Sequence, residues 1–213
     1  MGPLFESCWA KGRRHLDAAK LRDLLRRKIY KDLDMDVYPP RPHRIMESVN
    51  KYFPDAVKVC DIGKNKYYSG LLLHASEPNS VLFSNMQSAM GFTSGAIGAT
   101  FATNKRVVVI TGDGGFMMNP QEIATAVRYN KQLVVIVIND NGLGLVRAKQ
   151  IEEHNQKYAV DFPNPDFVKY ADAFGVKGYS VNSWGHFDRV MREVAASDEY
   201  AIVEVPVDYS EGI

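Results

Sequence analysis

Two short clusters of Gly, Asp and Asn follow two runs of β-branched residues, and both carry oxygen ligands suited to a metal ion. GDGG, residues 112–115, follows RVVVIT, and NDNG, residues 139–142, follows LVVIVI. Asp113 and Asp140 are therefore expected just past the ends of two strands. If those strands are parallel neighbours, their backbones lie about 5 Å apart and the two carboxylates are close together. Their repulsion raises a pKa unless a bound divalent cation relieves it.

The atoms of these clusters indicate which ligand they bind. Carboxylate, amide and backbone carbonyl oxygens select a hard ion such as Mg²⁺ or Ca²⁺ over zinc. Gly112, Gly114 and Gly115 allow backbone N–H groups to approach an anion closely, so we interpret the pair as a metal–diphosphate site. Each turn alone is an ordinary structural turn, and the interpretation depends on their joint placement. The clusters do not extend to GxGxxG, and GxxxxGK[ST] does not occur.

The elements between the two clusters form one repeating unit. Residues 106–111 and 133–138 are predicted as buried strands because their apolar runs are unbroken. Residues 120–130 are predicted as a helix, with Asn119 as its N-cap and Glu122 as the acidic residue of a capping box. Strand, helix and strand over this length predict a βαβ unit whose two strands are parallel neighbours.

The rest of the chain from residue 39 continues the alternation of strand and helix patterns. Helical patterns are HRIMESVNKYF, SAMGFTSGAIGATFAT, FVKYADAFG and HFDRVMREVAAS, and strand patterns are AVKVCDIG, NSVLFS and AIVEVPVD. The predicted fold class is α/β, with a mostly parallel sheet and helices on both faces. With 213 residues and 46% hydrophobic content, the chain can form one domain plus an appendage.

The appendage is the basic amino-terminal segment. Residues 11–31 carry nine Lys and Arg against two Asp, with leucines at helical spacing, which predicts one amphipathic helix. A transit peptide or a nucleic-acid arm is a less favoured alternative, because Asp17 and Asp23 interrupt the basic face. YPPRP disfavours continued helix. The predicted organisation is a linker helix over 1–38 and a domain over 39–213.

Charge and cysteine content exclude several classes of partner. The net charge of +1 gives no general electrostatic reason to expect a nucleic-acid partner. No apolar run approaches the roughly 20 residues that cross a bilayer, so no membrane partner is expected. Cys8 and Cys60 form no CxxC motif, and the chain has no apolar secretory segment. These features predict a cytoplasmic protein.

The segment from Gly112 to Asn141 resembles the GDG…N(D/N) thiamine-diphosphate motif, including the spacing of 27 between Asp113 and Asp140. Residues 39–209 resemble the carboxy-terminal, diphosphate-binding domain of acetolactate synthase and its pyruvate-oxidase relatives. The Asp at 140, where many relatives have Asn, is similar to the catabolic, FAD-independent synthases, as are VDYS and VDFPNPDFVKYADAFG. The resemblance implies thiamine diphosphate and Mg²⁺ as cofactors, with Asp113, Asp140 and the Gly142 carbonyl as metal ligands.

Other site residues are implied by the same resemblance. Met90 matches the methionine that supports the V-shaped cofactor, although a methionine at the start of an apolar helix is otherwise usually a core residue. Ser88 matches the residue whose carbonyl receives the 4′-amino group, and Leu145 matches an apolar residue of the substrate channel. DIGKNK corresponds to a loop on the diphosphate in which synthases usually have Val, Gln and His. The expected cofactor-binding residues are Ile62, Lys64, Asn65, Ser88, Met90, Gly112, Asp113, Gly114, Gly115, Asn141, Gly142, Leu143, Gly144 and Leu145.

The resemblance also implies a partner. The family activates its cofactor with a glutamate on a pyrimidine-binding domain, and the residues before Tyr38 are too few to build that domain. We therefore expect no catalytic residue in this chain and little activity from it alone. It is expected to be a fragment or a separate subunit, with the basic helix favouring a fragment. Because family sites lie between subunits, a homo- or hetero-oligomer is expected.

The expected reaction is decarboxylation of pyruvate and transfer of the two-carbon unit to a second 2-oxo acid, as in acetolactate synthase. A second hypothesis is the diphosphate-binding part of another 2-oxo acid decarboxylase or acetyltransferase. A third, from a different class, is a non-catalytic regulatory module that retains the fold.

Overall fold

The computed structural model describes residues 20–21, 24, 37–84 and 89–209. The chain divides into two compact units, Met1–Asp34 and Met35–Ile213. Lys20, Leu21 and Leu24 are helical, and the remainder of the predicted amphipathic helix lies outside the described residues. Its role as a linker and the boundary after residue 38 stay predictions.

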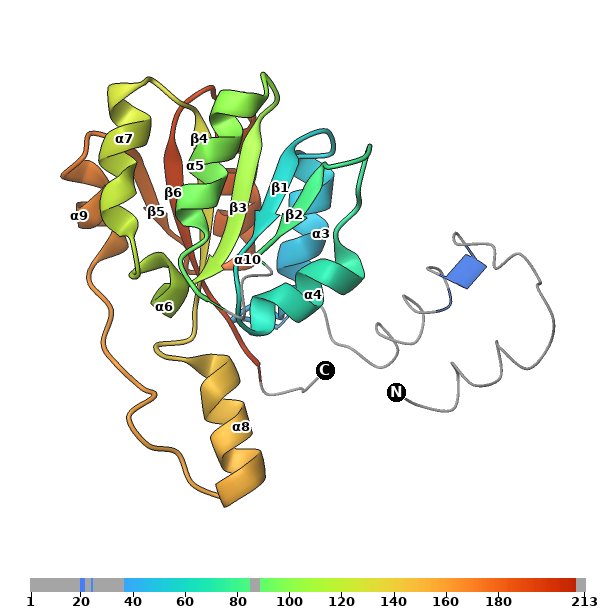
Figure 1. The fold of residues 1–213 in the computed structure, drawn as a ribbon, viewed down its shortest axis with the longest axis vertical. Coiled ribbons are helices and arrows are strands. Elements are labelled where there is room, and N and C mark those ends of the chain that lie inside the picture. Colours follow the sequence, from blue (N-terminus) through green and yellow to red (C-terminus); the bar gives the residue numbers. More distant parts are fainter. Residues whose placement is uncertain (1–19, 22–23, 25–36, 85–88, 210–213) are drawn as a thin grey trace. The chain divides into compact units, whose positions relative to one another are not determined.

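Within the described part of the second unit, six strands form one sheet in the order β2-β1-β3-β4-β6-β5 (Figure 1). The strands are β1 Val57–Cys60, β2 Val81–Phe83, β3 Val107–Gly112, β4 Leu133–Asn139, β5 Lys177–Ser180 and β6 Ala201–Pro206. Every neighbouring pair is parallel. The predicted βαβ unit is confirmed, because β3 and β4 pair directly in parallel.

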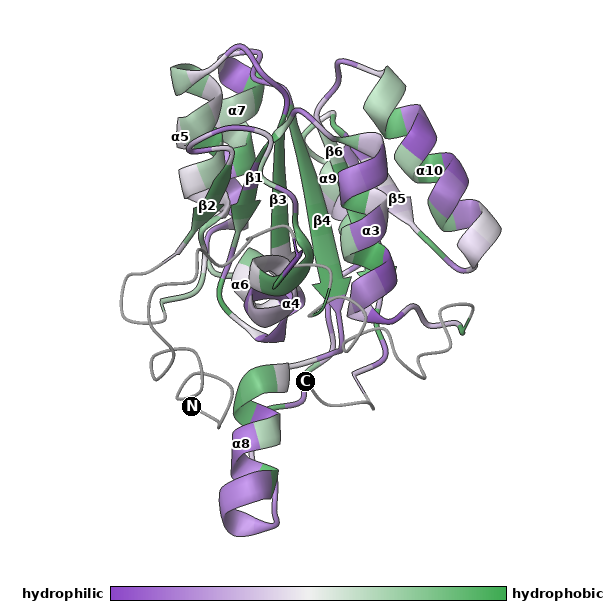
Figure 2. Cartoon of the chain, turned by 90° about the vertical axis from the view of Figure 1, so that its right-hand side faces the viewer, coloured by the Kyte–Doolittle hydropathy of each residue, from purple (hydrophilic) through white to green (hydrophobic). Residues whose placement is uncertain are grey.

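Helices cover both faces of the sheet, as predicted: Figure 2 shows α5 and α7 on one face and α3 and α10 on the other. The helices are α3 Pro42–Tyr52, α4 Lys64–Leu72, α5 Thr93–Ala102, α6 Asp113–Phe116, α7 Ile123–Arg128, α8 Gly144–His154, α9 Phe167–Asp172 and α10 Trp184–Ala196. A 3-10 turn, η1 Pro120–Glu122, precedes α7. Among the described residues, no helix combines the length and the apolar character needed to cross a membrane.

The core explains why the central strands are continuous apolar runs. Val107, Val109 and Val135 pack in one buried cluster with Ala96 of α5 and Ile123 of α7. Side chains alternate between the two faces of a strand, so the intervening residues face the helices on the other side. A strand that is buried on both faces needs apolar residues at every position.

The predicted capping box at Asn119 is wrong. Asn119 precedes η1, but its side chain makes no cap hydrogen bond. Its Nδ2 instead donates to the Gly91 carbonyl at 2.7 Å and to Ser94 Oγ at 3.1 Å. Glu122 accepts from Thr125 Oγ1 at 2.9 Å. The amide that could cap its own helix is used to hold a distant turn.

Candidate functional site

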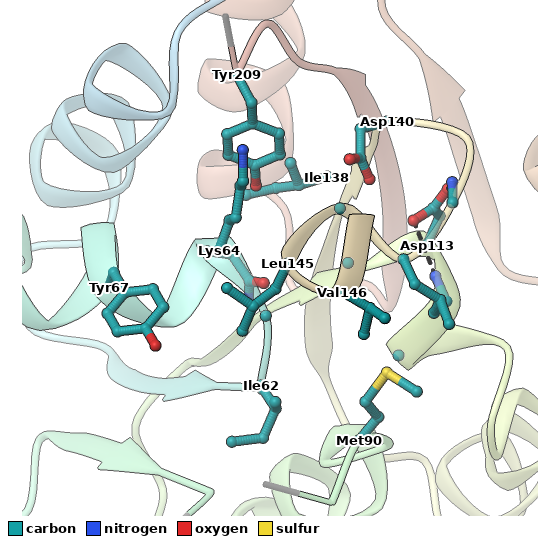
Figure 3. Close-up of a pocket in the computed structure, with 18 of the residues that line it drawn as sticks. Ile62, Lys64, Tyr67, Met90, Asp113, Ile138, Asp140, Leu145, Val146 and Tyr209 are labelled. Atoms are coloured by element: carbon teal, nitrogen blue, oxygen red, sulfur yellow. Dashed lines mark hydrogen bonds between the residues drawn. The ribbon is translucent and has the colours of Figure 1, made fainter. Parts of the chain in front are cut away.

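A cavity of about 290 Å³ lies at the carboxyl ends of β1, β3 and β4 (Figure 3). The chain places β2 on one side of β1 and β3 on the other, so the strand order reverses there. Ligands of open α/β sheets bind outside the carboxyl ends of the strands at such a reversal. The cavity is lined by expected site residues: Ile62, Lys64, Asn65, Met90, Gly112, Asp113, Gly114, Gly115, Asp140, Gly142, Leu143, Gly144 and Leu145.

Asp113 follows β3 and is the first residue of α6. Its side chain is buried, with the residue 1% exposed. Oδ1 accepts from the Gly114 N–H at 2.9 Å, and Oδ2 accepts from the Gly142 N–H at 3.0 Å. The second bond joins the two predicted turns directly. Oδ2 also accepts from Asn164 Nδ2 at 2.6 Å, a partner that the sequence analysis did not identify.

Asp140 follows β4 and faces the same cavity. Its pKa is raised to about 6, first by burial and second by the Asp113 carboxylate, against the lowering effect of Arg147 and Lys64. The like-charge interaction expected from the strand ends is therefore present. Arg147 Nη1 lies 3.1 Å from Asp140 Oδ2 and partly neutralises it.

Arg147 also fixes the turn that carries Asp140. Its Nε donates to Asp161 Oδ1 at 2.7 Å, and its Nη2 donates to the carbonyls of Asp140 and Asn141, both at 3.2 Å. An isolated antiparallel bridge joins Gly142 to Asp161. The turn is thus held by the segment that follows α8.

Asn141 lies in this turn with a left-handed φ of 53°. It does not line the main cavity but borders an adjacent one. Its carbonyl accepts from the Phe162 N–H at 3.2 Å, and its N–H donates to Asn139 Oδ1 at 2.9 Å. Its expected role in cofactor binding stays a prediction.

On the β1 side, Lys64 and Asn65 lie in the first turn of α4 and not in a loop, which corrects that part of the sequence interpretation. Asn65 Nδ2 donates to the carbonyls of Asp61 and Ile110 at 3.1 and 3.3 Å. Its donors join the ends of β1 and β3 and are not available to a phosphate. The Lys64 ammonium lies 4.9 Å from the centre of the Tyr209 ring. Figure 3 shows both side chains at the same end of the cavity.

Met90 lies at the opposite wall of the cavity. The next residue, Gly91, has a φ of 95° and donates its N–H to Asp61 Oδ2 at 3.1 Å. Its carbonyl accepts the Asn119 bond described above, so the backbone beside Met90 is held on both sides. Ser88, the other residue expected here, lies outside the described residues.

Six lining residues were not predicted. They are Gly63, Tyr67, Ile138, Val146, Lys149 and Tyr209. Lys149 follows Leu145 by four residues and so shares its helical face, a signal that was present in the sequence. Tyr209 follows β6, and only the pairing of β6 with β4 brings it to the site.

The residues present fit a metal–diphosphate group. A Cβ on Gly114 would lie 2.8 Å from Leu143 Cδ2, and a Cβ on Gly144 would meet the Asp140 carboxylate. The glycines therefore let the turns after β3 and β4 pack closely together. Among the described residues, no group of three or more His, Cys, Asp or Glu is placed to hold a metal. A hard ion at Asp113 and Asp140 would need carbonyl and phosphate oxygens to complete its coordination, as Mg²⁺ commonly does.

The sequence of this chain matches one protein-family model across the cavity-forming elements. Residues 61–205 match the thiamine pyrophosphate enzyme, C-terminal TPP binding domain. The chain belongs to this thiamine pyrophosphate enzyme family. Membership confirms the predicted resemblance and supports thiamine diphosphate as the cofactor of the domain.

Several curated relatives of this thiamine pyrophosphate enzyme domain are acetolactate synthases. The chain is 36% identical to acetolactate synthase of Bacillus subtilis (strain 168) over 175 residues, which is 81% of this chain and 31% of that protein. It is 31% identical to the catabolic acetolactate synthase of Raoultella terrigena, over 91% of this chain and 34% of that protein. It is 28% identical to 3D-(3,5/4)-trihydroxycyclohexane-1,2-dione hydrolase of Bacillus subtilis (strain 168), over 75% of this chain and 27% of that protein. The chain thus spans about a third of the length of these relatives.

Proposed function

We propose that this chain is the Mg²⁺- and thiamine diphosphate-binding part of an acetolactate synthase-like enzyme. The observation that carries the proposal is the direct hydrogen bond between the Gly142 N–H and Asp113 Oδ2, which joins two oxygen-rich strand ends at one cavity. The enzyme decarboxylates pyruvate and transfers the two-carbon unit to a second 2-oxo acid. The resemblance to synthases, one of them catabolic, supports this reaction.

In this proposal the side chains of Asp113 and Asp140 and the carbonyl of Gly142 hold Mg²⁺. Backbone N–H groups at the glycine-rich start of α6 and at the start of α8 would be donors to the diphosphate, since helix amino-termini favour an anion. Lys64 and Lys149, both at the cavity, add positive charge.

Apolar residues account for the rest of the cofactor site. Ile62, Met90 and Leu145 line the cavity and offer surfaces for the rings of the cofactor. When bound, thiamine diphosphate supplies the carbanion-stabilising chemistry of decarboxylation. The residues of this chain bind it, orient it and exclude water from it.

The site needs a second component. The described lining of the main cavity contains no glutamate that could activate the cofactor. We propose that a pyrimidine-binding domain or subunit supplies this group, that the complete enzyme is an oligomer, and that the 213-residue chain alone has little or no activity.

The first test is a calorimetric titration of the chain with thiamine diphosphate, with and without Mg²⁺. We expect binding that depends on Mg²⁺ and is lost in Asp113→Asn, while Asp172→Asn, an exposed acidic residue of α9, binds as the wild type does. If an Asp113→Asn variant folds and binds thiamine diphosphate with unchanged affinity, the assignment of Asp113 as a metal ligand is wrong. A regulatory module without cofactor predicts no binding by the wild type.

A pyruvate decarboxylation assay tests the requirement for a partner. We expect no turnover by the chain alone and turnover after addition of the pyrimidine-binding part of a homologous synthase. Turnover by the chain alone would show that it contains its own activating group. Use of a different 2-oxo acid in the complemented assay would favour the decarboxylase or acetyltransferase alternative.

A further inference from the structure

We propose that Asn164 is a positioning residue that orients the Asp113 carboxylate for its cation. The proposal rests on the metal site of the proposed function. Asn164 lies in the segment between α8 and α9, which contributes no residue to the main cavity. Its Nδ2 donates to Asp113 Oδ2 at 2.6 Å and to Asn139 Oδ1 at 2.9 Å.

The amide of Asn164 is itself held by a chain of side chains. Asn139, at the end of β4, donates through Nδ2 to Glu204 Oε1 at 2.6 Å. Its Oδ1 accepts from Asn164 and from the Asn141 N–H at 2.9 Å. Glu204 lies on β6, so the network joins the ends of β6, β4 and β3. Each amide nitrogen faces an oxygen acceptor, which fixes the orientation of both amides.

This network makes the two oxygens of Asp113 unequal. Among the described residues, Oδ2 accepts two hydrogen bonds, from Gly142 and Asn164, whereas Oδ1 accepts one, from the adjacent Gly114 N–H. The bonds to Oδ2 fix the rotation of the carboxylate and leave Oδ1 with acceptor capacity for a cation. Partners that orient metal ligands in this way typically contribute about 10-fold to 100-fold to metal affinity.

A positioning role differs measurably from a general contribution to stability. Mg²⁺ requires near-ideal octahedral geometry, whereas Ca²⁺ tolerates flexible coordination. A carboxylate that rotates freely should therefore lose affinity for Mg²⁺ more than for Ca²⁺. A general loss of stability should leave the ratio of the two affinities unchanged.

The experiment uses the full chain with the same fixed excess of thiamine diphosphate in every titration. Mg²⁺ and Ca²⁺ affinities are measured by calorimetry, and Mn²⁺ binding is counted by electron paramagnetic resonance. The variants are Asn164→Ala and Asn164→Leu, the second of which keeps the side-chain volume without the amide. Val190→Ala, in the buried face of α10, is the control for lost stability. Urea unfolding of each variant gives its stability.

We expect both Asn164 variants to bind Mg²⁺ about 10-fold to 100-fold more weakly and Ca²⁺ with a smaller loss, while Val190→Ala lowers stability and leaves the affinity ratio unchanged. Folded Asn164 variants with wild-type Mg²⁺ affinity, or with equal losses of affinity for both ions, would overturn this inference and leave the proposed function standing. Absence of Mg²⁺-dependent binding in the wild type would overturn the proposed function and the inference with it.

Discussion

Asp61 organises the cavity wall without lining it. Its side chain is fully buried at the end of β1. Oδ2 accepts from Thr111 Oγ1 at 2.8 Å and from the Gly91 N–H at 3.1 Å, and Oδ1 accepts from the Ile62 N–H at 2.8 Å. One carboxylate therefore links the ends of β1 and β3 to the turn beside Met90. Burying such a polar group is costly unless it is hydrogen-bonded, as Asp61 is here.

Gly115→Ala tests how closely this carboxylate is packed. A Cβ at residue 115 would lie 2.5 Å from Asp61 Oδ2 and 2.8 Å from Thr111 Oγ1. We expect a loss of about 1–3 kcal/mol in the free energy of unfolding, as for other overpacked cores, measured by urea titration. Gly98→Ala in α5 is the matched control, because no atom lies within 4 Å of its Cβ. We expect that control to gain about 0.4–1 kcal/mol; equal effects of the two substitutions would contradict the packing argument.

At the scale of elements, the central strands follow from their unbroken apolar runs and α5 from its run of small and apolar residues. α3, α9 and α10 follow from apolar residues at helical spacing. Two helices do not. α4 has a weak apolar stripe and begins after Gly63, which offers no side-chain cap, and α8 buries none of its residues. Neither gives the periodic signal on which helix prediction depends.

The amino-terminus of α9 provides a test of local capping. Asp166 accepts from the Val168 and Lys169 N–H groups at 3.1 and 3.0 Å. Its pKa is lowered, chiefly by the Lys169 backbone hydrogen bond, so its stabilising effect is present above the unfolded-state pKa of about 3.9 and is lost as the pH falls through the lower folded-state value.

We expect Asp166→Ala to lower the urea midpoint at about pH 7, and the difference from the wild type to shrink with acidification below the unfolded-state pKa. Asp172→Ala, at the other end of α9, is the control. Its carboxylate opposes the helix dipole, so its removal should not lower the midpoint. An Asp166→Ala midpoint equal to the wild-type value near neutrality would contradict the capping assignment.

At the scale of the whole molecule, the site is assembled by the parallel sheet from segments far apart in the chain. The spacing of Asp113 and Asp140 predicted their proximity, because consecutive strands of a βαβ unit pair directly. Asn164 and Tyr209 could not be predicted in the same way. Their positions depend on the path of the segment after α8 and on the insertion of β6 between β4 and β5, neither of which leaves a local pattern.

Cys60 reports on the integrity of this sheet. It is a free, fully buried thiol in β1, and burial raises its pKa to about 12. Because the thiolate is the reactive form, we expect no alkylation of Cys60 by iodoacetamide in the native chain near pH 8. Labelling should rise with urea in parallel with the loss of circular dichroism, as followed by peptide mass spectrometry. Labelling before global unfolding would show that the edge of the sheet beside β1 opens separately.

The bridge between Gly142 and Asp161 closes the base of the excursion that contains α8. The Leu143 N–H also donates to the Val160 carbonyl at 2.8 Å, so the chain leaves and returns at one point. The entropy of closing such a loop grows only with the logarithm of its length, at about 0.6 kcal/mol for each doubling. Homologous chains are therefore free to lengthen or shorten the tip beyond His154 at little cost to the sheet. A foreign peptide grafted there would be displayed away from the strands that assemble the cavity.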